Sequence, residues 1–194
     1  MNCYIFQKRR LIVGINEMNE ENAGTPPQPV VTYRLATEAD FPVIKEYYSL
    51  LNEHFYRLGY RLPHPENVGD VYLDSFRRTL GKYSNAWVAE VDGQVVAYIL
   101  CRIKRVPQYM GGVLVGELSD EWVDASARRL RIGDRLCRIA LEWLREQGVH
   151  SVEIQVLNSN EASWKMLSRM GFEQEFRVGR LVWDEYVNDS SQKR

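Results

Sequence analysis

One short stretch of the chain has the residue types and spacing of an anion-binding site. It reads WVDASARRLRIGDRL over residues 122–136, and five arginines and one aspartate lie between Arg128 and Arg138. The stretch leads from the expected end of a strand through a loop into the first turn of an expected helix. Backbone N–H groups and the positive end of the dipole point out of a helix start, and Gly133 lets a phosphate approach closely. The pattern predicts a pyrophosphate site, and a solvated basic helix face is the alternative.

Three acidic residues precede this stretch on the same expected strand, and each is a candidate general base. In a regular strand Glu117 and Glu121 share one face, and Asp120 lies on the other. A base is needed if the substrate is an amine, because alkylamines are mostly protonated at pH 7. We predict Glu117 and then Glu121 as the base, and rank Asp120 below both. The alternative is that a partly solvated strand simply carries polar residues.

Hydrophobic periodicity and turn residues predict the elements that position these groups. The expected order is strand, helix, helix, three strands, helix, strand, helix, and a final strand or strand pair. Asp92-Gly93 predicts a type I′ hairpin, and Asn158 with Glu161 forms a capping-box pattern. The result is a mixed α/β sheet with a parallel crossover through helix 132–147. The expected ranges are 30–35, 37–51, 71–80, 86–91, 94–104, 113–123, 132–147, 151–156, 159–170 and 172–183.

Composition and charge describe an ordinary globular protein. The 194 residues are 45% hydrophobic and 26% charged, which fits one compact domain with a sizeable core. A net charge of -1 excludes a global field that recruits nucleic acid or an anionic membrane. The three cysteines, Cys3, Cys101 and Cys137, are too widely spaced to suggest a disulfide framework or a zinc site. We therefore expect a cytoplasmic protein.

The two ends of the chain differ from its middle. Residues 1–29 are expected to be a flexible extension, because residues 16–28 (NEMNEENAGTPPQ) are too polar to bury enough surface. Met18 begins this polar stretch and is a candidate for the natural start. A single domain is expected over 30–187, followed by a polar tail, 188–194. No run of eighteen apolar residues occurs, so neither membrane spanning nor secretion is expected.

With these features in view, the chain resembles the GNAT superfamily of acetyl-CoA-dependent N-acetyltransferases over roughly residues 30–183. In that family a loop of the form [Arg or Gln]-x-x-Gly-x-[Gly or Ala] binds the CoA pyrophosphate at a helix start. Residues 128–133 match this loop at Arg128 and Gly133 and depart from it at Arg131, where the family usually has glycine. An arginine there still offers its backbone N–H, provided that its backbone avoids positive φ.

A second family motif, Asn-x-x-Ala-x-x-Leu-Tyr followed by Gly-Phe, lies downstream. The chain matches it at Asn160, Gly171 and Phe172. The family's tyrosine, commonly proposed to protonate the departing thiolate, falls at Leu167, which cannot donate a proton. Other hydroxyl groups that could serve belong to Ser163, Ser168 and Tyr186.

The resemblance implies a GNAT fold, an α/β structure with a mixed central sheet flanked by helices. It implies transfer of an acetyl group from acetyl-CoA to a primary amine by direct attack, without a metal. The thioester carbonyl would accept a hydrogen bond from a backbone N–H near Val123, and Asn160 would bind the pantetheine arm. Glu117 lies eleven residues before Arg128, which resembles the general base of histone-acetylating members. The residues expected to bind acetyl-CoA are Trp122, Val123, Arg128, Arg129, Arg131, Ile132, Gly133, Asp134 and Asn160.

Several alternatives stay open at this point. The acceptor is either a small amine or a protein lysine or amino terminus, and a homodimer is an expected form because dimers are common in the family. A coenzyme A binding or sensing module without turnover is the rival function, favoured by Leu167 and Arg131. Nucleic-acid binding through the arginines is disfavoured by the net charge. Five aromatic residues are expected in the core or, by resemblance, beside a cationic amine: Tyr47, Tyr48, Phe55, Tyr56 and Tyr60.

Overall fold

The computed structural model describes residues 29–128 and 130–183, which form two compact units. The first comprises residues 29–51 and 66–155, and the second comprises residues 52–65 and 156–183. Several predictions made above lie outside the described residues. They concern residues 1–28 of the extension with Cys3 and Met18, Arg129, Tyr186 and the tail 188–194.

The first unit is built on a five-stranded sheet whose spatial order follows the chain. Neighbouring strands are antiparallel from β1 to β4, and β4 pairs with β5 in parallel. The predicted mixed sheet and its parallel crossover are therefore confirmed. The strands are β1 (Val31–Leu35), β2 (Ser84–Val91), β3 (Gln94–Arg105), β4 (Leu114–Val123) and β5 (Ser151–Ile154).

The turn between β2 and β3 is the predicted type I′ hairpin. Asp92 and Gly93 both have positive φ, 51° and 79°, as this turn requires at its two central positions. The turn fixes the register that places Val91 opposite Gln94.

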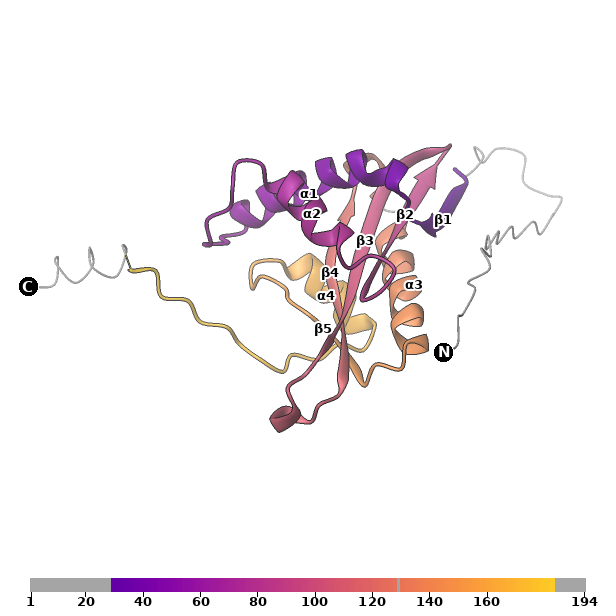
Figure 1. The fold of residues 1–194 in the computed structure, drawn as a ribbon. Coiled ribbons are helices and arrows are strands. Elements are labelled where there is room, and N and C mark those ends of the chain that lie inside the picture. The colour runs from indigo at the N-terminus through magenta and orange to yellow at the C-terminus, as the bar shows by residue number, and fades with distance from the viewer. Residues whose placement is uncertain (1–28, 129, 184–194) are drawn as a thin grey trace, which may run out of the picture. The chain divides into compact units, whose positions relative to one another are not determined.

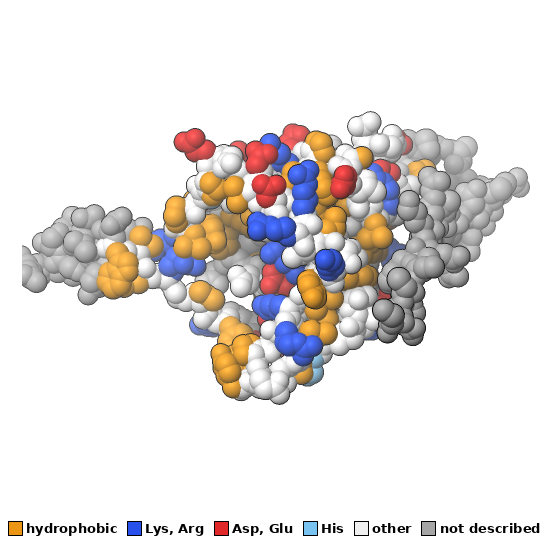
Figure 2. All heavy atoms as spheres, viewed as in Figure 1, with side chains coloured by type: hydrophobic (Ala, Val, Ile, Leu, Met, Phe, Trp, Pro, Cys, Tyr) orange, Lys and Arg blue, Asp and Glu red, His pale blue; other side chains and the backbone are white. Residues whose placement is uncertain are grey.

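Two helices, α1 (Phe41–Arg57) and α2 (Val68–Arg77), cover one face of this sheet, and α3 (Ile132–Glu146) covers the other (Figure 1). The α1/α2 face buries a cluster rich in aromatic rings, in which Phe41 meets Phe76 edge to face at 5.6 Å. Figure 2 shows acidic side chains beside basic ones over α1 and α2, where Lys45 Nζ lies 2.6 Å from Asp70 Oδ1. The cluster comprises Phe41, Ile44, Tyr47, Tyr72, Leu73, Phe76, Ala86, Val88, Tyr98 and Leu100.

Helix α3 packs on β2, β3 and β4 through one apolar face. Trp87 of β2 meets Trp143 edge to face, with 5.8 Å between ring centroids. A Cβ added at Gly116 of β4 would lie 2.9 Å from both Cδ atoms of Leu144, so only glycine lets the helix approach this closely. The buried residues of α3 are Ile132, Leu136, Cys137, Ala140 and Leu144, the one-sided spacing predicted from the sequence.

The structure differs from three predictions about helix ends and strands. Helix α1 continues to Arg57 rather than ending near residue 51, because no breaker occurs before Gly59, whose φ is 91°. Helix α4 (Glu161–Arg169), in the second unit, is capped by Asn160 rather than Asn158. The strand predicted over 172–183 is wrong, because 172–182 have no regular structure. Its alternating apolar residues, Phe176 and Val178 among them, form no strand pairing with the described residues and are exposed.

The close packing of α3 on β4 leads to a test by substitution. Gly116→Val should lower the free energy of unfolding by about 1–3 kcal/mol, because its side chain would collide with Leu144. Urea unfolding of the wild type, the two single variants and the double variant Gly116→Val/Leu144→Ala measures the coupling. The double variant should lose less free energy of unfolding than the two single variants lose together. Losses that simply add would contradict the contact between residue 116 and Leu144.

Candidate functional site

Strand β4 loses one of its two neighbours halfway along its length. Its parallel pairing with β5 runs from Val115 to Leu118 and then stops, while its pairing with β3 continues to Val123. Among the described strands, residues 119–123 therefore pair on one side only. The backbone N–H and C=O groups of the other edge remain to be satisfied, which is the condition for binding an extended ligand along that edge.

A β-bulge in the same region reverses the side-chain alternation. Cys101 pairs with Leu118 and the next residue back, Leu100, pairs with Asp120, so Ser119 is the extra residue. Gly116 and Glu121 consequently both face α3 although they are five residues apart. The prediction that Glu117 and Glu121 share a face is wrong. Asp120, predicted on the opposite face, lies with Glu117 on the α1/α2 side.

The start of α3 has no side-chain cap. Its N-cap residue is Arg131, whose φ of 55° and ψ of 27° place it in the left-handed region. The expectation that Arg131 avoids positive φ is wrong, and this geometry explains why glycine suits the position. Since the first amides of a helix lack intrahelical acceptors, Ile132, Gly133 and Asp134 offer N–H groups to an anion. The side chain of Ile132 is buried, so only its backbone is on offer.

The loop before α3 is ordered by its own polar contacts. Asp124 Oδ1 accepts hydrogen bonds from the backbone N and the hydroxyl of Ser126, at 2.9 and 2.6 Å. Arg128 Nε donates to the carbonyl of Val123 at 3.3 Å, and its guanidinium lies 5.7 Å from the centre of the Trp122 ring. The loop therefore connects the end of β4 directly to the start of α3.

The charged side chains of α3 remain around this start. Asp134 and Arg138 pair across one turn at 2.9 Å, and Arg131 and Arg135 are exposed. The predicted anion-binding residues from Trp122 to Asp134, Arg129 apart, thus lie on one continuous strand, loop and helix start. Their contact with acetyl-CoA stays a prediction.

Glu121 faces the first turn of α3. A Cβ added at Gly133 would lie 2.5 Å from Glu121 Oε1, so any larger residue there would force the carboxylate to shift. Oε1 is buried without a hydrogen-bond partner among the described residues, and Oε2 accepts from the thiol of Cys137 at 3.6 Å. Burial raises the pKa of Glu121 to about 7; the thiol hydrogen bond opposes this rise and the charge of Asp134 adds to it.

Glu117 is held in a salt-bridge network across three strands. Lys104 of β3 lies 3.4 Å from Glu117 Oε2 and also pairs with Glu153 of β5. The hydroxyl of Ser119 donates to Glu117 Oε1 at 3.0 Å. The hydrogen bond to Glu153, and to a lesser degree the charges of Glu153 and Glu117, raise the pKa of Lys104 against the opposing effect of burial. Both oxygens of Glu117 are therefore already engaged.

Asp120 sits among tyrosines on the α1/α2 side. Tyr72 of α2 donates to Asp120 Oδ2 at 3.1 Å, and Tyr98 of β3 adjoins this pair. The side chain of Tyr98 is fully buried, and its hydroxyl interacts with that of Tyr72. Burial raises the pKa of Asp120 to about 6, against the opposing effects of Arg102 and the Tyr72 hydrogen bond. Sequence reasoning ranked Asp120 last because nothing in the sequence indicates the bulge.

The second family motif lies in the second unit. Asn160 Oδ1 accepts from the backbone N of Ser163 at 3.2 Å and so caps α4. Its role in holding pantetheine stays a prediction. Leu167 is fully buried and takes the place of the family's tyrosine without any group that could donate a proton.

The aromatic residues are divided between the units. Tyr47 and Tyr48 belong to the first unit, where Tyr47 packs in the core and Tyr48 stacks on Tyr72. Phe55, Tyr56 and Tyr60 belong to the second, where their rings contact each other. That unit also has a hollow of about 430 Å³, lined by Glu53, Tyr56, Arg57 and His64.

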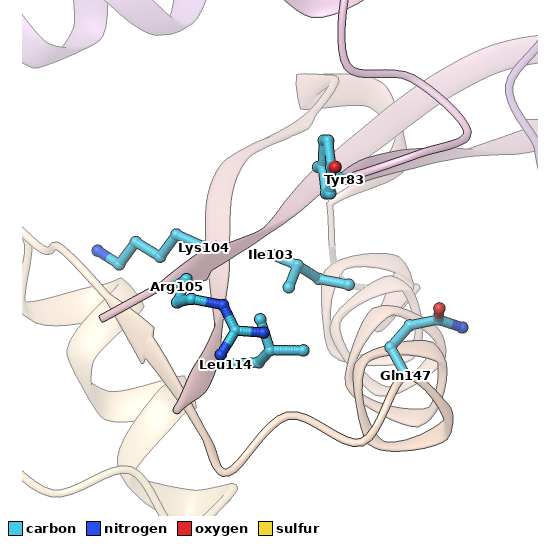
Figure 3. A pocket seen from close by; sticks show the side chains of 6 residues that line it. All are labelled: Tyr83, Ile103, Lys104, Arg105, Leu114 and Gln147. Atoms are coloured by element: carbon cyan, nitrogen blue, oxygen red, sulfur yellow. The ribbon is translucent and has the colours of Figure 1, made fainter. Parts of the chain in front are cut away.

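Another hollow, of about 410 Å³, lies beside the opposite end of α3 (Figure 3). Its basic groups are engaged, because Lys104 pairs with Glu117 and Glu153, and Arg105 Nη1 donates to the carbonyl of Gly112 at 2.6 Å. Since α3 has 15 residues, its two ends are about 20 Å apart. This hollow is therefore separate from the anion loop. It is lined by Tyr83, Ile103, Lys104, Arg105, Leu114 and Gln147.

The two described cysteines are poorly suited to act as nucleophiles, because the pKa of each thiol is raised. Cys101 and Cys137 are buried free thiols, and burial raises the pKa of Cys101 to about 12. Burial and the Glu121 carboxylate raise that of Cys137. Within the described ranges no group of three His, Cys, Asp or Glu could hold a metal ion. None of the helices there has the length and apolar character needed to cross a bilayer.

Comparison with known proteins places this geometry in a family. The model of the acetyltransferase (GNAT) family matches residues 44–172, which include both motifs and the strand and helix between them. The chain is 30% identical over 86 residues to the probable N-acetyltransferase camello of Xenopus tropicalis. That match covers 44% of this chain, and the chain spans only 37% of the relative's length.

Solved structures agree on the fold. An aminoglycoside N-acetyltransferase, AAC(6')-Iy, in complex with CoA gives a TM-score of 0.65 at 16% identity, covering 81% of this chain and 97% of the other. A predicted acetyltransferase with acetyl-CoA from Clostridium acetobutylicum gives 0.64 at 16% identity, covering 80% and 98%. The predicted α/β fold with a mixed sheet is thereby confirmed.

The left-handed backbone at Arg131 allows a stability test. Arg131→Gly should raise the free energy of unfolding by roughly 1 kcal/mol, because glycine adopts positive φ without the steric penalty of a Cβ. Arg135→Gly, inside the same helix, is the control and should lower it by about the same amount. Equal losses in both variants, measured by urea unfolding, would show that Arg131 is not left-handed in solution.

The buried Glu121 predicts how stability depends on pH. Its pKa of about 7 in the folded chain lies above the ordinary glutamate value of 4.5. Its contribution to stability is therefore complete below pH 4.5 and is lost as the pH rises through 7. Glu121→Gln should flatten this decline and raise the free energy of unfolding at pH 8 by on the order of 2 kcal/mol.

Glu142→Gln, an exposed position on α3, is the matched control for this experiment. The control should keep the wild-type slope between pH 4.5 and 8. A Glu121→Gln variant that also kept it would show that Glu121 is solvated. The pKa of Asp120 is also raised, so the free energy of unfolding of Glu121→Gln should still decline with rising pH, but by less than in the wild type.

Proposed function

Because the chain belongs to the acetyltransferase (GNAT) family, we propose that it transfers the acetyl group of acetyl-CoA to a primary amine by direct attack. The observation that carries this proposal is the uncapped start of α3 beside the unpaired half of β4. The start of α3 offers backbone amides to the diphosphate of the donor. The free edge of β4 offers backbone groups to the pantetheine arm that follows the diphosphate. The two are joined by a loop of only eight residues, 124–131.

The diphosphate would be bound by backbone and side-chain groups together. The amides at the start of α3 point toward the anion, and the helix dipole favours negative charge there. Arg128 adds a guanidinium that is already positioned by the Val123 carbonyl and the Trp122 ring. A planar guanidinium can pair with a phosphate through two hydrogen bonds, which strengthens and orients the contact.

The thioester would lie along the free edge of β4. A backbone N–H near Val123 is placed to donate to its carbonyl oxygen, where negative charge develops as the amine attacks. Such a donor needs no particular side chain. Leu167 supplies no acid for the departing sulfur, but a thiol with a pKa of about 8.5 leaves without much assistance at neutral pH. The absence of the tyrosine is therefore compatible with turnover.

The acceptor is proposed to be a cationic amine before it loses its proton. Alkylamines are mostly protonated at neutral pH, so the acceptor arrives as an ammonium group and must lose a proton before it attacks. Whether the amine belongs to a small molecule or to a protein is decided by the assay below, which includes both.

A coenzyme A binding module without turnover is the second candidate. Two observations favour it, namely the buried Leu167 in place of a proton donor and the strained Arg131 in the anion loop. A module of this kind would bind acetyl-CoA and release no coenzyme A when amines are added. Binding and release are therefore measured separately.

Calorimetry with acetyl-CoA and a thiol-release assay test the two candidates together. The amines are lysine, cadaverine, spermidine and a lysine-containing peptide. We expect heat on binding and release of coenzyme A above hydrolysis with at least one amine. Binding without release supports the module, and an absence of heat contradicts both.

Arg128→Ala tests the position of the diphosphate. Removing this guanidinium should weaken acetyl-CoA binding about tenfold, because a charge-assisted contact to a phosphate is lost. Arg145→Ala, in the last turn of α3 and exposed, is the matched control and should leave the dissociation constant unchanged. Equal effects in both variants would place the diphosphate elsewhere.

A further inference from the structure

We propose that Asp120 takes the proton from the attacking amine and that the Tyr72 hydroxyl holds its carboxylate in place. This inference rests on the proposed acetyl transfer and names the base for it. The structure supplies two reasons: the bulge that aims Asp120 to the α1/α2 side, and the Tyr72 hydroxyl that donates to Oδ2 of its carboxylate.

The bulge decides which acidic side chain can reach a substrate on the α1/α2 side. Without Ser119 as an extra residue, Asp120 would point toward α3 and Glu121 would point toward α1 and α2. With it, Asp120 contacts Tyr72 of α2, and Glu121 is packed between Gly133 and Cys137. Because α3 covers Glu121, an amine on the α1/α2 side meets Asp120 instead.

The two other acids are less suited to accept a proton. Glu117 is paired with Lys104 through Oε2 and accepts a hydrogen bond from Ser119 at Oε1, so both of its oxygens are already engaged. In the described part of the chain, the Asp120 carboxylate accepts one side-chain hydrogen bond, from Tyr72 to Oδ2, and we infer that Oδ1 takes the amine proton. Its raised pKa of about 6 brings it close to the working pH, where a base is both ionised and able to hold a proton.

The surroundings of Asp120 are set by groups from four elements. Arg102 lowers its pKa through its positive charge, and Glu117 raises it. Two tyrosine hydroxyls surround the carboxylate, and burial together with its charge raises the pKa of each well above the usual value, so both stay protonated. The titratable groups concerned are Tyr48 of α1, Tyr72 of α2, Tyr98 and Arg102 of β3, and Glu117 of β4.

The step balances without any further reactant. The Asp120 carboxylate takes one proton from the ammonium, and the freed lone pair of the nitrogen forms the N–C bond. The C–S bond breaks and its electron pair leaves on sulfur. The surplus proton of the new amide nitrogen passes to the thiolate, and Asp120 returns its proton to solvent. The products are the N-acetylated amine, coenzyme A as the thiol, and one proton.

The test is the pH profile of kcat/KM for Asp120→Asn in the full chain, with acetyl-CoA and the amine that gives the fastest release. At pH 7.5 the rate should fall by 10²–10⁴-fold, the range for loss of a general base. The loss should shrink as the pH approaches the amine's own pKa of about 10.4, where the free amine needs no base. The wild-type decline of kcat/KM as the pH falls through about 6 (the acid limb) should disappear in the variant. The affinity for acetyl-CoA measured by calorimetry should stay unchanged.

Three further variants keep the outcome interpretable. Asp120→Glu should recover part of the rate, and Tyr72→Phe should move the acid limb to higher pH, because a hydrogen bond that favours the carboxylate is lost. Asp74→Asn, an exposed position on α2, should behave as wild type. Thermal unfolding establishes that each variant is folded.

Two results would overturn the inference. One is an Asp120→Asn chain that binds acetyl-CoA and keeps the wild-type rate and acid limb. The other is loss of that limb in Glu117→Gln but not in Asp120→Asn. A wild-type chain that releases no coenzyme A with any of the amines would instead contradict the proposed function itself, and Asp120 with it.

Discussion

The geometry of the proposed site depends on the point at which the pairing between β4 and β5 ends. Pairing ends at Leu118, and the extra residue Ser119 follows at once. The first event leaves one edge of residues 119–123 without a strand partner, and the second turns Asp120 and Glu121 to opposite faces. A strand that continued in register would have no edge to offer a thioester and would hide Asp120 beneath α3. The free strand edge proposed to bind the acetyl donor and the Asp120 carboxylate beside it thus arise from the same local irregularity.

Packing on both faces holds this irregularity in place. On one side, an aromatic cluster from α1 and α2 surrounds Tyr98, and Trp122 at the end of β4 packs against it. On the other side, Gly116 admits Leu144, and Gly133 admits the Glu121 carboxylate, so α3 lies tightly on β4 at both points. Because close-packed interiors resist small displacements, the helix start and the strand end keep a fixed relation. Such preorganisation is what binding a diphosphate and polarising a carbonyl both require.

Much of this arrangement could be predicted from the sequence, for reasons that are local. The arginine-rich loop, the Asp92-Gly93 turn and the one-sided pattern of α3 are each specified within about fifteen residues. The bulge could not be predicted, because strand pairing is a property of two segments and a one-residue shift reverses every later side chain. The expectation that Glu117 and Glu121 share a face was wrong for that reason. The left-handed backbone of Arg131 and the lack of a strand over 172–182 likewise depend on contacts with distant residues, which a local sequence pattern does not contain.

A crystal structure of the chain with acetyl-CoA tests the central claim most directly. The claim is that the end of β4 and the start of α3 form one binding surface for the donor. We expect diphosphate oxygens about 2.7–3.2 Å from the backbone nitrogens at the start of α3, and the thioester along residues 119–123 on the side of Asp120. A donor bound instead in the hollow between Tyr83 and Gln147, or with its thioester away from β4, would contradict the account.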